Sequence, residues 1–232
     1  KFVLCSGRSN MSLDVLNEQL GLVKENNYTV AFNGSTIYEN VSKKKLVNHL
    51  LKGEYGGEVL DILRRYPVNV LAYENEKLWC DKPTERIKRY ARNSFIPYYV
   101  TEDLRELVSH DFSKIIAISD NEKLSQIQQA CNSCGITEKV GVFFSGEDIL
   151  EFNPYNIDKG TGVKDLLEKI NIDPSEAIAI GDNFNDIPMI ENVGMGVAVK
   201  NGVDEIKSVA NYVTENDNNH NAVAEVIQKF IM

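Results

Sequence analysis

Residues 177–186 form a short apolar run that ends in two aspartates. The run reads Ala-Ile-Ala-Ile-Gly-Asp-Asn-Phe-Asn-Asp, with Gly181 at the break and Asp182 and Asp186 behind it. A short apolar run that stops at a glycine predicts a buried parallel strand. Open α/β sheets bind their ligands beyond the carboxyl ends of such strands. We therefore expect both carboxylates at the functional edge of an α/β sheet.

Two carboxylates this close repel each other unless a positive charge neutralises them. A hard divalent cation, which prefers oxygen ligands, would do so, and so would the ammonium of Lys159, which lies upstream in Asp-Lys-Gly. A second interpretation treats Gly-Asp-Asn as a turn and Asp186 as a helix-capping residue. Other segments of the chain favour the metal site.

A second apolar run, at residues 2–5, is followed by Ser6-Gly7-Arg8. A small hydroxyl and backbone amides at a strand end suit a phosphate. Gly7 lets the chain turn, and Arg8 offers a planar fork for phosphate oxygens. Taken alone, the tripeptide fits an ordinary strand-to-helix turn with a solvated arginine better than a phosphate site.

In this order and spacing, the motifs resemble the haloacid dehalogenase superfamily of phosphohydrolases. More narrowly, the chain resembles the Cof-type branch (subfamily IIB), in which a large α/β cap of the C2 type is inserted after the second motif. The resemblance covers nearly all 232 residues. The matching segments are Ser6-Gly7-Arg8, Asn33-Gly34-Ser35, Lys159-Gly160, Gly181 to Asp186, Gly196 to Asn201 and Ala210 to Thr214.

The sequence departs from the family at its start. Family members begin with a strand that ends in Asp-x-Asp-Gly-Thr, whose first aspartate is the nucleophile and whose second is the general acid and base. No such segment occurs between Lys1 and Met232. We expect a strand and helix of roughly 30 residues or more ahead of Lys1, because a parallel sheet without an internal strand would expose backbone groups and apolar faces. The alternative is a catalytically inactive relative.

The resemblance implies the α/β class, with a Rossmann-like parallel-sheet core and an inserted α/β cap. We expect the core at residues 1–44 and 153–232, and the cap at 45–152. Alternating strands and helices predict a right-handed parallel sheet in the core, and the insert predicts an open-faced antiparallel sheet. Expected strands are 2–5, 28–32, 36–38, 68–73, 77–80, 114–119, 140–144, 177–180, 195–198 and 211–213. Expected helices are 12–24, 83–92, 101–108, 121–133, 159–170, 184–192, 203–208 and 219–231.

The composition of the chain argues against nucleic-acid and membrane partners. With 25 Lys and Arg against 34 Asp and Glu, the formal net charge is −9, which repels nucleic-acid phosphates. No apolar stretch approaches the length of a membrane span, so we expect no membrane partner and a cytoplasmic protein. Four cysteines, one of them in an expected core strand, fit a reducing compartment.

The resemblance implies magnesium-dependent hydrolysis of a phosphomonoester through an aspartyl-phosphate. Asp182 and Asp186 form the implied metal site. Asp182 would hold Mg²⁺ directly, and Asp186 would orient metal-bound water or the catalytic lysine.

Five further residues have implied roles toward the phosphoryl group. Lys159 would neutralise the charge of the nucleophile and of the phosphoryl oxygens. Ser6 and Asn185 would donate hydrogen bonds to the transferring phosphoryl group. Arg8 and Asn33 would line the substrate pocket.

The cap would set the substrate, because the core recognises only a phosphate and a metal. The expected substrate is a small phosphorylated metabolite, and sugar phosphates are the family's usual substrates. Candidate residues facing it are Glu151, Tyr155 and the strand end at 143–146. Two alternatives stay open: a non-catalytic phosphate- or partner-binding protein, and a phosphosugar mutase relative. We expect a monomer or weak homodimer.

Overall fold

The computed structural model describes all 232 residues. The chain divides into two compact units, an N-terminal unit Lys1–Ile157 and a C-terminal unit Asp158–Met232. The first holds a four-stranded and a six-stranded sheet, and the second holds a three-stranded sheet. The expected core and cap boundaries at residues 44 and 152 stay a prediction.

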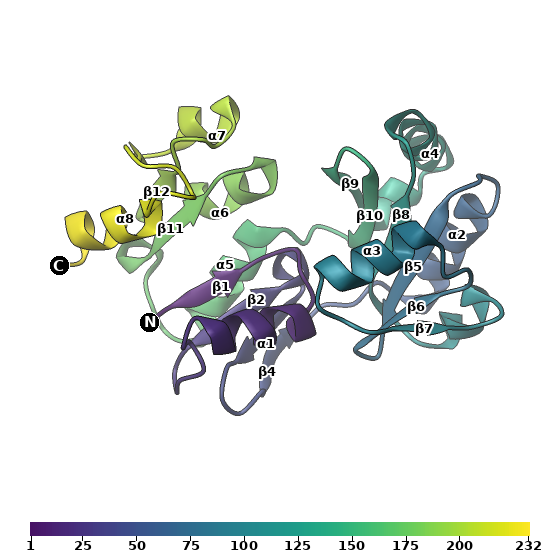
Figure 1. Ribbon diagram of the computed structural model, residues 1–232, viewed down its shortest axis with the longest axis horizontal. Coiled ribbons are helices and arrows are strands. Elements are labelled where there is room, and N and C mark those ends of the chain that lie inside the picture. Colours follow the sequence, from purple (N-terminus) through teal and green to yellow (C-terminus); the bar gives the residue numbers. More distant parts are fainter. The chain divides into compact units, whose positions relative to one another are not determined.

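The four-stranded sheet carries the first phosphate-binding candidates. Its order is β1 (Val3–Cys5), β2 (Tyr28–Ala31), β3 (Thr36–Glu39) and β4 (Lys45–Asn48). β1 is parallel to β2, and the other pairs are antiparallel. Helix α1 (Asn10–Gln19) connects β1 to β2 and lies beside them (Figure 1). Ser6 therefore follows a strand end, as the apolar run predicts.

Helix α1 is shorter than the expected helix 12–24. It begins at Asn10 because the Ser9 side chain accepts a hydrogen bond from the backbone amide of Ser12. It ends before Gly21, which has a φ of 66°. A left-handed glycine there stops the helix.

The six-stranded sheet has the order β7-β6-β5-β8-β10-β9 and is antiparallel except between β6 and β7. Its strands are β5 (Asn69–Glu74), β6 (Lys77–Cys80), β7 (Tyr98–Val100), β8 (Phe112–Ile118), β9 (Val140–Gly146) and β10 (Ile149–Pro154). Strands β4, β7 and β10 were not expected from the sequence. The expected helix 101–108 is a 3-10 helix at Leu104–Ser109.

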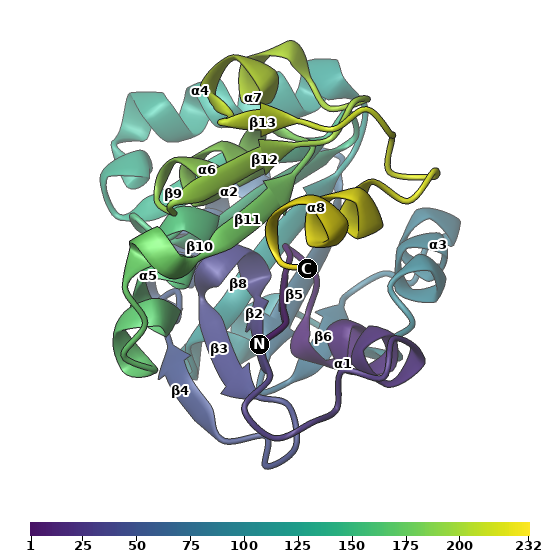
Figure 2. The same ribbon diagram turned by 90° about the vertical axis from the view of Figure 1, so that its left-hand side faces the viewer.

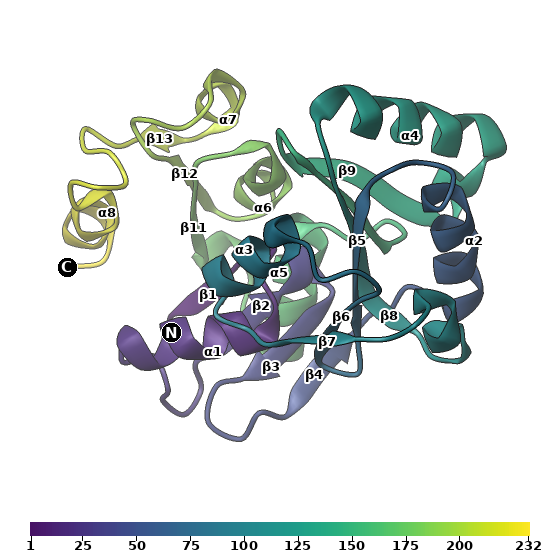
Figure 3. The ribbon, with the colours of Figure 1, turned by 45° about the vertical axis from the view of Figure 1, so that its right-hand side comes forward.

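Both faces of the six-stranded sheet are covered. Helices α2 (Gly53–Leu63) and α4 (Asn121–Cys134) lie on one face (Figure 3). They pack around buried side chains such as Ile115 and Phe152. The other face, which includes Leu71, Tyr73, Ile116 and Ile118, packs against helix α3 (Glu85–Asn93) and against apolar residues of the four-stranded sheet. This second cluster joins the two sheets into one unit.

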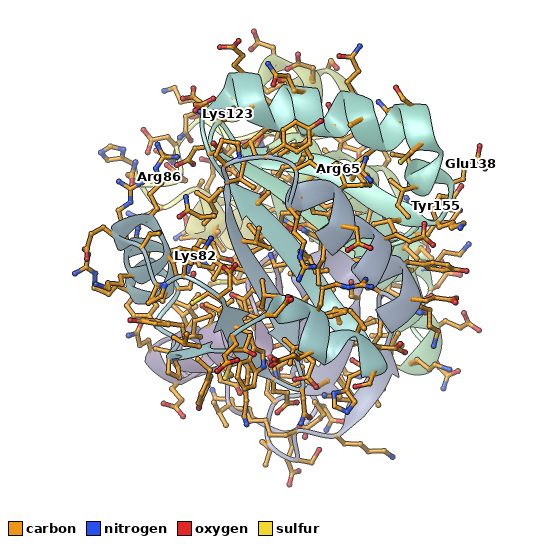
Figure 4. The ribbon with its side chains drawn as sticks, turned by 90° about the vertical axis from the view of Figure 1, so that its right-hand side faces the viewer. Arg65, Lys82, Arg86, Lys123, Glu138 and Tyr155 are labelled. Atoms are coloured by element: carbon orange, nitrogen blue, oxygen red, sulfur yellow. The ribbon has the colours of Figure 1, made fainter.

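The helical side of this sheet is bordered by charged residues. Figure 4 shows Lys123 at the start of α4 and Glu138 beyond its end. Lys123 forms an exposed ion pair of 2.5 Å with Asp120. Tyr155, a candidate substrate-facing residue, lies at the rim of this view and is 48% exposed.

The C-terminal unit contains the parallel sheet β11-β12-β13, whose three strands lie side by side in Figure 2. Its elements are α5 (Lys159–Lys169), β11 (Ile178–Gly181), α6 (Ile187–Glu191), β12 (Met195–Ala198), α7 (Asp204–Val209), β13 (Tyr212–Val213) and α8 (Ala222–Phe230). All three strands agree with the expected strands within one residue at each end. No helix of the structure is both long and apolar enough to cross a bilayer.

Helices α5 and α6 approach closely at Gly160. A Cβ atom at this position would lie 2.5 Å from the backbone oxygen of Pro188, which cannot move aside freely. This contact sets the spacing between the first turn of α5, with Lys159, and the segment that carries Asp186. A glycine is therefore needed beside the candidate lysine for a packing reason.

We expect Gly160→Ala to lower the free energy of unfolding by about 1–3 kcal/mol, the usual cost of overpacking. Gly146→Ala is the matched control, because a Cβ there meets nothing within 4 Å. Urea denaturation of both variants makes the comparison. Equal stability of the two would contradict the close approach at Pro188.

Candidate active site

Lys159 is buried at the start of α5. Asp158 caps this helix, with its Oδ1 accepting a hydrogen bond from the Thr161 amide at 2.7 Å. The Lys159 Nζ lies 2.5 Å from Asp186 Oδ1, and the two side chains are 8% and 6% exposed. The lysine is therefore held in a buried ion pair and is not a solvated helix-start residue.

The second oxygen of Asp186 holds the turn that follows β11. Asp186 Oδ2 accepts hydrogen bonds from the backbone amides of Asp182 at 3.0 Å and Asn183 at 3.2 Å. A Cβ on Gly181 would lie 2.4 Å from the Asp186 Cβ. Asp186 thus organises the turn and also pairs with Lys159. The second interpretation of the sequence, in which Gly-Asp-Asn forms a turn and Asp186 acts as a capping residue, agrees with the role of Asp186 in organising the turn.

The carboxylate of Asp182 lies next to this pair and is partly open to solvent. Partial burial raises the pKa of Asp182, and the negative charge of Asp186 raises it further, while Lys159 opposes the shift. A carboxylate whose ionised form is disfavoured in this way would gain from a bound cation. Asn185 lies in the same 3-10 turn, Phe184–Asp186.

No group of three or more His, Cys, Asp or Glu side chains is arranged to hold a metal ion. Mg²⁺ does not require such a group, because proteins usually bind it through one or two carboxylates together with water and substrate phosphate. The carboxylate of Asp182, next to a turn that Asp186 holds in place, fits this mode of Mg²⁺ binding.

The loop after β1 is tied to the turn after β2. The amide of Asn33 donates to the carbonyl of Ser6 at 3.0 Å, and the amide of Phe32 donates to the carbonyl of Arg8 at 2.9 Å. Ser6 Oγ accepts a hydrogen bond from the Arg8 amide at 3.2 Å. The structure therefore brings Ser6, Arg8 and Asn33 together in the N-terminal unit.

Arg8 and Asn33 both contact the region of the six-stranded sheet. Arg8 Nη1 donates to the carbonyl of Asn93, in the last turn of α3, at 3.1 Å. Asn33 Nδ2 donates to Glu151 Oε2 at 3.3 Å. The guanidinium of Arg8 is therefore already engaged by a helix C-terminus.

Lys114 is a buried charge that the sequence analysis missed. It is 1% exposed, and its Nζ lies 2.8 Å from Glu151 Oε1. Burial is the largest single influence on the pKa of Lys114 and lowers it, but the charge of Glu151, the neighbouring Tyr90 and the hydrogen bond to Glu151 together outweigh burial, so the pKa is raised. The only sequence signal was a lone lysine within the strand Phe-Ser-Lys-Ile-Ile-Ala-Ile.

A separate crevice of about 570 Å³ lies in the N-terminal unit. Its polar lining includes an ion pair between Lys45 and Glu76 at 2.7 Å and a contact of 3.1 Å between His110 and Glu74. None of the site residues expected from the sequence lines this crevice.

The sequence matches the family of haloacid dehalogenase-like hydrolases over residues 1–227. This chain belongs to that family. The recognition made from the motifs and the expected α/β fold are both confirmed, and the enzyme class is that of a hydrolase.

Relatives and solved structures agree with this assignment. A curated Streptococcus pyogenes protein, named a putative phosphatase, is 28% identical over 99% of this chain and 85% of its own length. A crystal structure of a haloacid dehalogenase-like hydrolase from Bacteroides thetaiotaomicron is 28% identical, with a TM-score of 0.89 over 97% of this chain and 85% of that one. An X-ray structure of a Thermotoga maritima protein is 30% identical, with a TM-score of 0.87 over 99% and 85%.

We expect Lys159→Ala to lower the free energy of unfolding by about 3–5 kcal/mol, because it leaves Asp186 buried without its cation. Lys169→Ala, an exposed lysine at the end of the same helix, is the control and should change stability by less than about 0.5 kcal/mol. Chemical denaturation of both variants measures the difference. Equal effects would show that the pair does not contribute as a buried interaction.

Proposed function

We propose that this protein is a magnesium-dependent phosphomonoester hydrolase that acts on small phosphorylated metabolites. The observation that carries this proposal is the cluster at the end of β11, in which one buried ammonium stands beside two carboxylates. The name of the Streptococcus pyogenes relative, a putative phosphatase, supports the same reaction class.

The charge of this cluster explains why a cation is needed. Lys159 supplies one positive charge and is paired with Asp186, while Asp182 adds a second negative charge. The cluster therefore repels a phosphate dianion as it stands. A divalent cation held by Asp182 would reverse the local charge, and it would supply Lewis-acid polarisation of a phosphoryl oxygen.

The remaining residues bind and orient. Ser6 accepts a hydrogen bond from the Arg8 amide, so its own hydroxyl proton is available to a phosphoryl oxygen. Asp186 fixes the ammonium of Lys159 and the backbone of Asp182 through its two oxygens. Preorganised donors of this kind stabilise developing charge without reorganising during the reaction. The family resemblance assigns Asn185 a similar donor role.

The nucleophile is the part of the family mechanism that these residues do not supply. Residues 1–232 contain no Asp-x-Asp-Gly-Thr segment. The roles proposed here belong to residues that would hold the phosphoryl group and the metal, and none of these residues is assigned as the nucleophile of an aspartyl-phosphate step.

The deciding experiment is a p-nitrophenyl phosphate assay of the protein made from its complete coding sequence, with and without Mg²⁺, followed by a panel of sugar phosphates. Magnesium-dependent release of phosphate supports the hydrolase. Binding of inorganic phosphate without turnover would favour the non-catalytic alternative. The same preparation tests the expected monomer or weak homodimer by size-exclusion chromatography with light scattering.

We expect Asp182→Asn to lower kcat/KM by about 10²-fold or more, since a lost metal contact costs at least as much as a lost supporting residue. The Mg²⁺ concentration for half-maximal activity should rise in parallel. Asp204→Asn, a fully exposed aspartate of the same unit, is the control. Near-normal magnesium-dependent turnover in Asp182→Asn would remove the metal assignment.

A further inference from the structure

Lys114 and Glu151 form a buried ion pair in the six-stranded sheet, with side chains 2% and 6% exposed. The face around them is otherwise built from residues such as Leu71 and Ile116. Burying two charges costs desolvation energy, and a well-packed apolar pair is often at least as stable. Stability of the sheet alone therefore does not explain why this position is charged.

Each member of the pair reaches out of its own sheet to a loop of the four-stranded sheet. Lys114 Nζ donates to the carbonyl of Gly7 at 3.0 Å. Glu151 Oε2 accepts from Asn33 Nδ2 at 3.3 Å. The pair therefore contacts the loop that carries Ser6 and also the turn that carries Asn33.

Aromatic rings enclose the remaining side of the ammonium. Lys114 Nζ lies 5.9 Å from the ring centroid of Phe32 and 5.7 Å from that of Tyr73. These two rings pack edge to face with their centroids 5.2 Å apart. An ammonium held by a carboxylate, a carbonyl and two ring faces has few other orientations available.

The turn that this pair supports is strained. Phe32 and Asn33 have φ values of 50° and 54°, in the left-handed region that non-glycine residues rarely adopt. Such residues persist only where their surroundings impose the conformation. The backbone bonds to Ser6 and Arg8 supply part of this constraint, and the contact of Asn33 with Glu151 supplies a second part.

We propose that Lys114 and Glu151 are positioning residues for phosphate binding, which hold the Ser6 loop and the Asn33 turn in their binding geometry from the six-stranded sheet. This inference rests on the proposed function, because it takes Ser6 as a phosphate ligand. It makes phosphate affinity depend on contact between the two sheets. By linkage, bound phosphate favours that contact to the same extent.

Three changes test this role. Lys114→Met keeps most of the side-chain stem but removes the donor to Gly7. Glu151→Gln keeps the shape of the side chain but removes its charge. It replaces Lys114→Met in the assays if the methionine variant is too unstable. The double variant Lys114→Glu with Glu151→Lys keeps opposite charges in the sheet but sets a carboxylate toward the Gly7 carbonyl and an ammonium toward the Asn33 amide.

Lys139→Met is the matched control. Lys139 forms an ion pair of 3.5 Å with Glu58 in the same unit, and both side chains are about half exposed. Removing this lysine changes the net charge of the same unit by the same amount without touching the phosphate-binding candidates.

Three measurements are made on the full-length protein: the Kd for inorganic phosphate, kcat and KM with p-nitrophenyl phosphate, and amide hydrogen exchange at residues 6–8 and 32–34. For Lys114→Met we expect phosphate affinity and kcat/KM to fall by about 10–100-fold. Exchange should accelerate at both loops. The Lys139→Met control should stay within about twofold of the wild type in all three.

The charge-swapped double variant distinguishes two roles of the pair: holding the Ser6 loop and the Asn33 turn in place, or only stabilising the six-stranded sheet. If the pair only stabilises its own sheet, the swap restores phosphate affinity. If the pair positions the loops, the swap stays as weak as Lys114→Met, because a carboxylate at position 114 repels the Gly7 carbonyl that Lys114 holds in the wild type. Wild-type phosphate affinity in the swapped variant would overturn the inference.

Failure of the inference and failure of the proposed function give different results. A wild-type protein that neither binds phosphate nor turns over p-nitrophenyl phosphate contradicts the proposed function. Unchanged exchange at residues 6–8 and 32–34 in Lys114→Met, in a protein whose wild type does bind phosphate, overturns the positioning role alone.

Discussion

Two buried lysines hold the loops on which the candidate chemistry depends. Lys159 is paired with Asp186, and Lys114 is paired with Glu151. In both pairs the second carboxylate oxygen accepts hydrogen bonds from a neighbouring loop: backbone amides after β11 in one, and the Asn33 side chain in the other. Removing either partner leaves an uncompensated charge in a region of low dielectric, which is far costlier than losing an exposed pair. These two buried ion pairs therefore hold the backbone geometry of the loops that their carboxylates contact.

Much of the strand framework could be predicted because buried strands leave a strong local signal. β6 and β12, for example, begin and end at the expected residues. β4 and β7 were missed because they are short strands at the ends of their sheets, where packing selects side chains only weakly. β10 was missed because it returns directly from β9, and a register shift near Ile149 interrupts the alternation that would have revealed it.

The part of the candidate site that could be predicted from the sequence consists of residues that follow the same strand. Asp182 and Asp186 are four positions apart behind one strand, so their proximity follows from the sequence. Lys159, which the sequence analysis names as a candidate cation for them, lies 2.5 Å from Asp186 in the structure. Lys114 lies 107 positions from Gly7, and their contact depends on how two sheets pack. No periodicity encodes a contact of that kind. Glu151, a candidate substrate-facing residue in the sequence analysis, pairs with Lys114 and contacts Asn33.

Strain in the turn after β2 links these observations. Phe32 lies in the left-handed region, which costs on the order of 1–3 kcal/mol for a bulky residue, and Asn33 beside it lies there too, in a residue type that tolerates it. A turn of that energy would relax toward ordinary backbone angles if its partners were lost, and it would carry the bonded Ser6 loop with it. The contacts that oppose relaxation come partly from the six-stranded sheet, through Glu151 and the aromatic face of Tyr73. The geometry of the phosphate-binding candidates is therefore set by two sheets acting together, and a change deep in the six-stranded sheet reaches these candidates through Glu151 and Tyr73 without touching them.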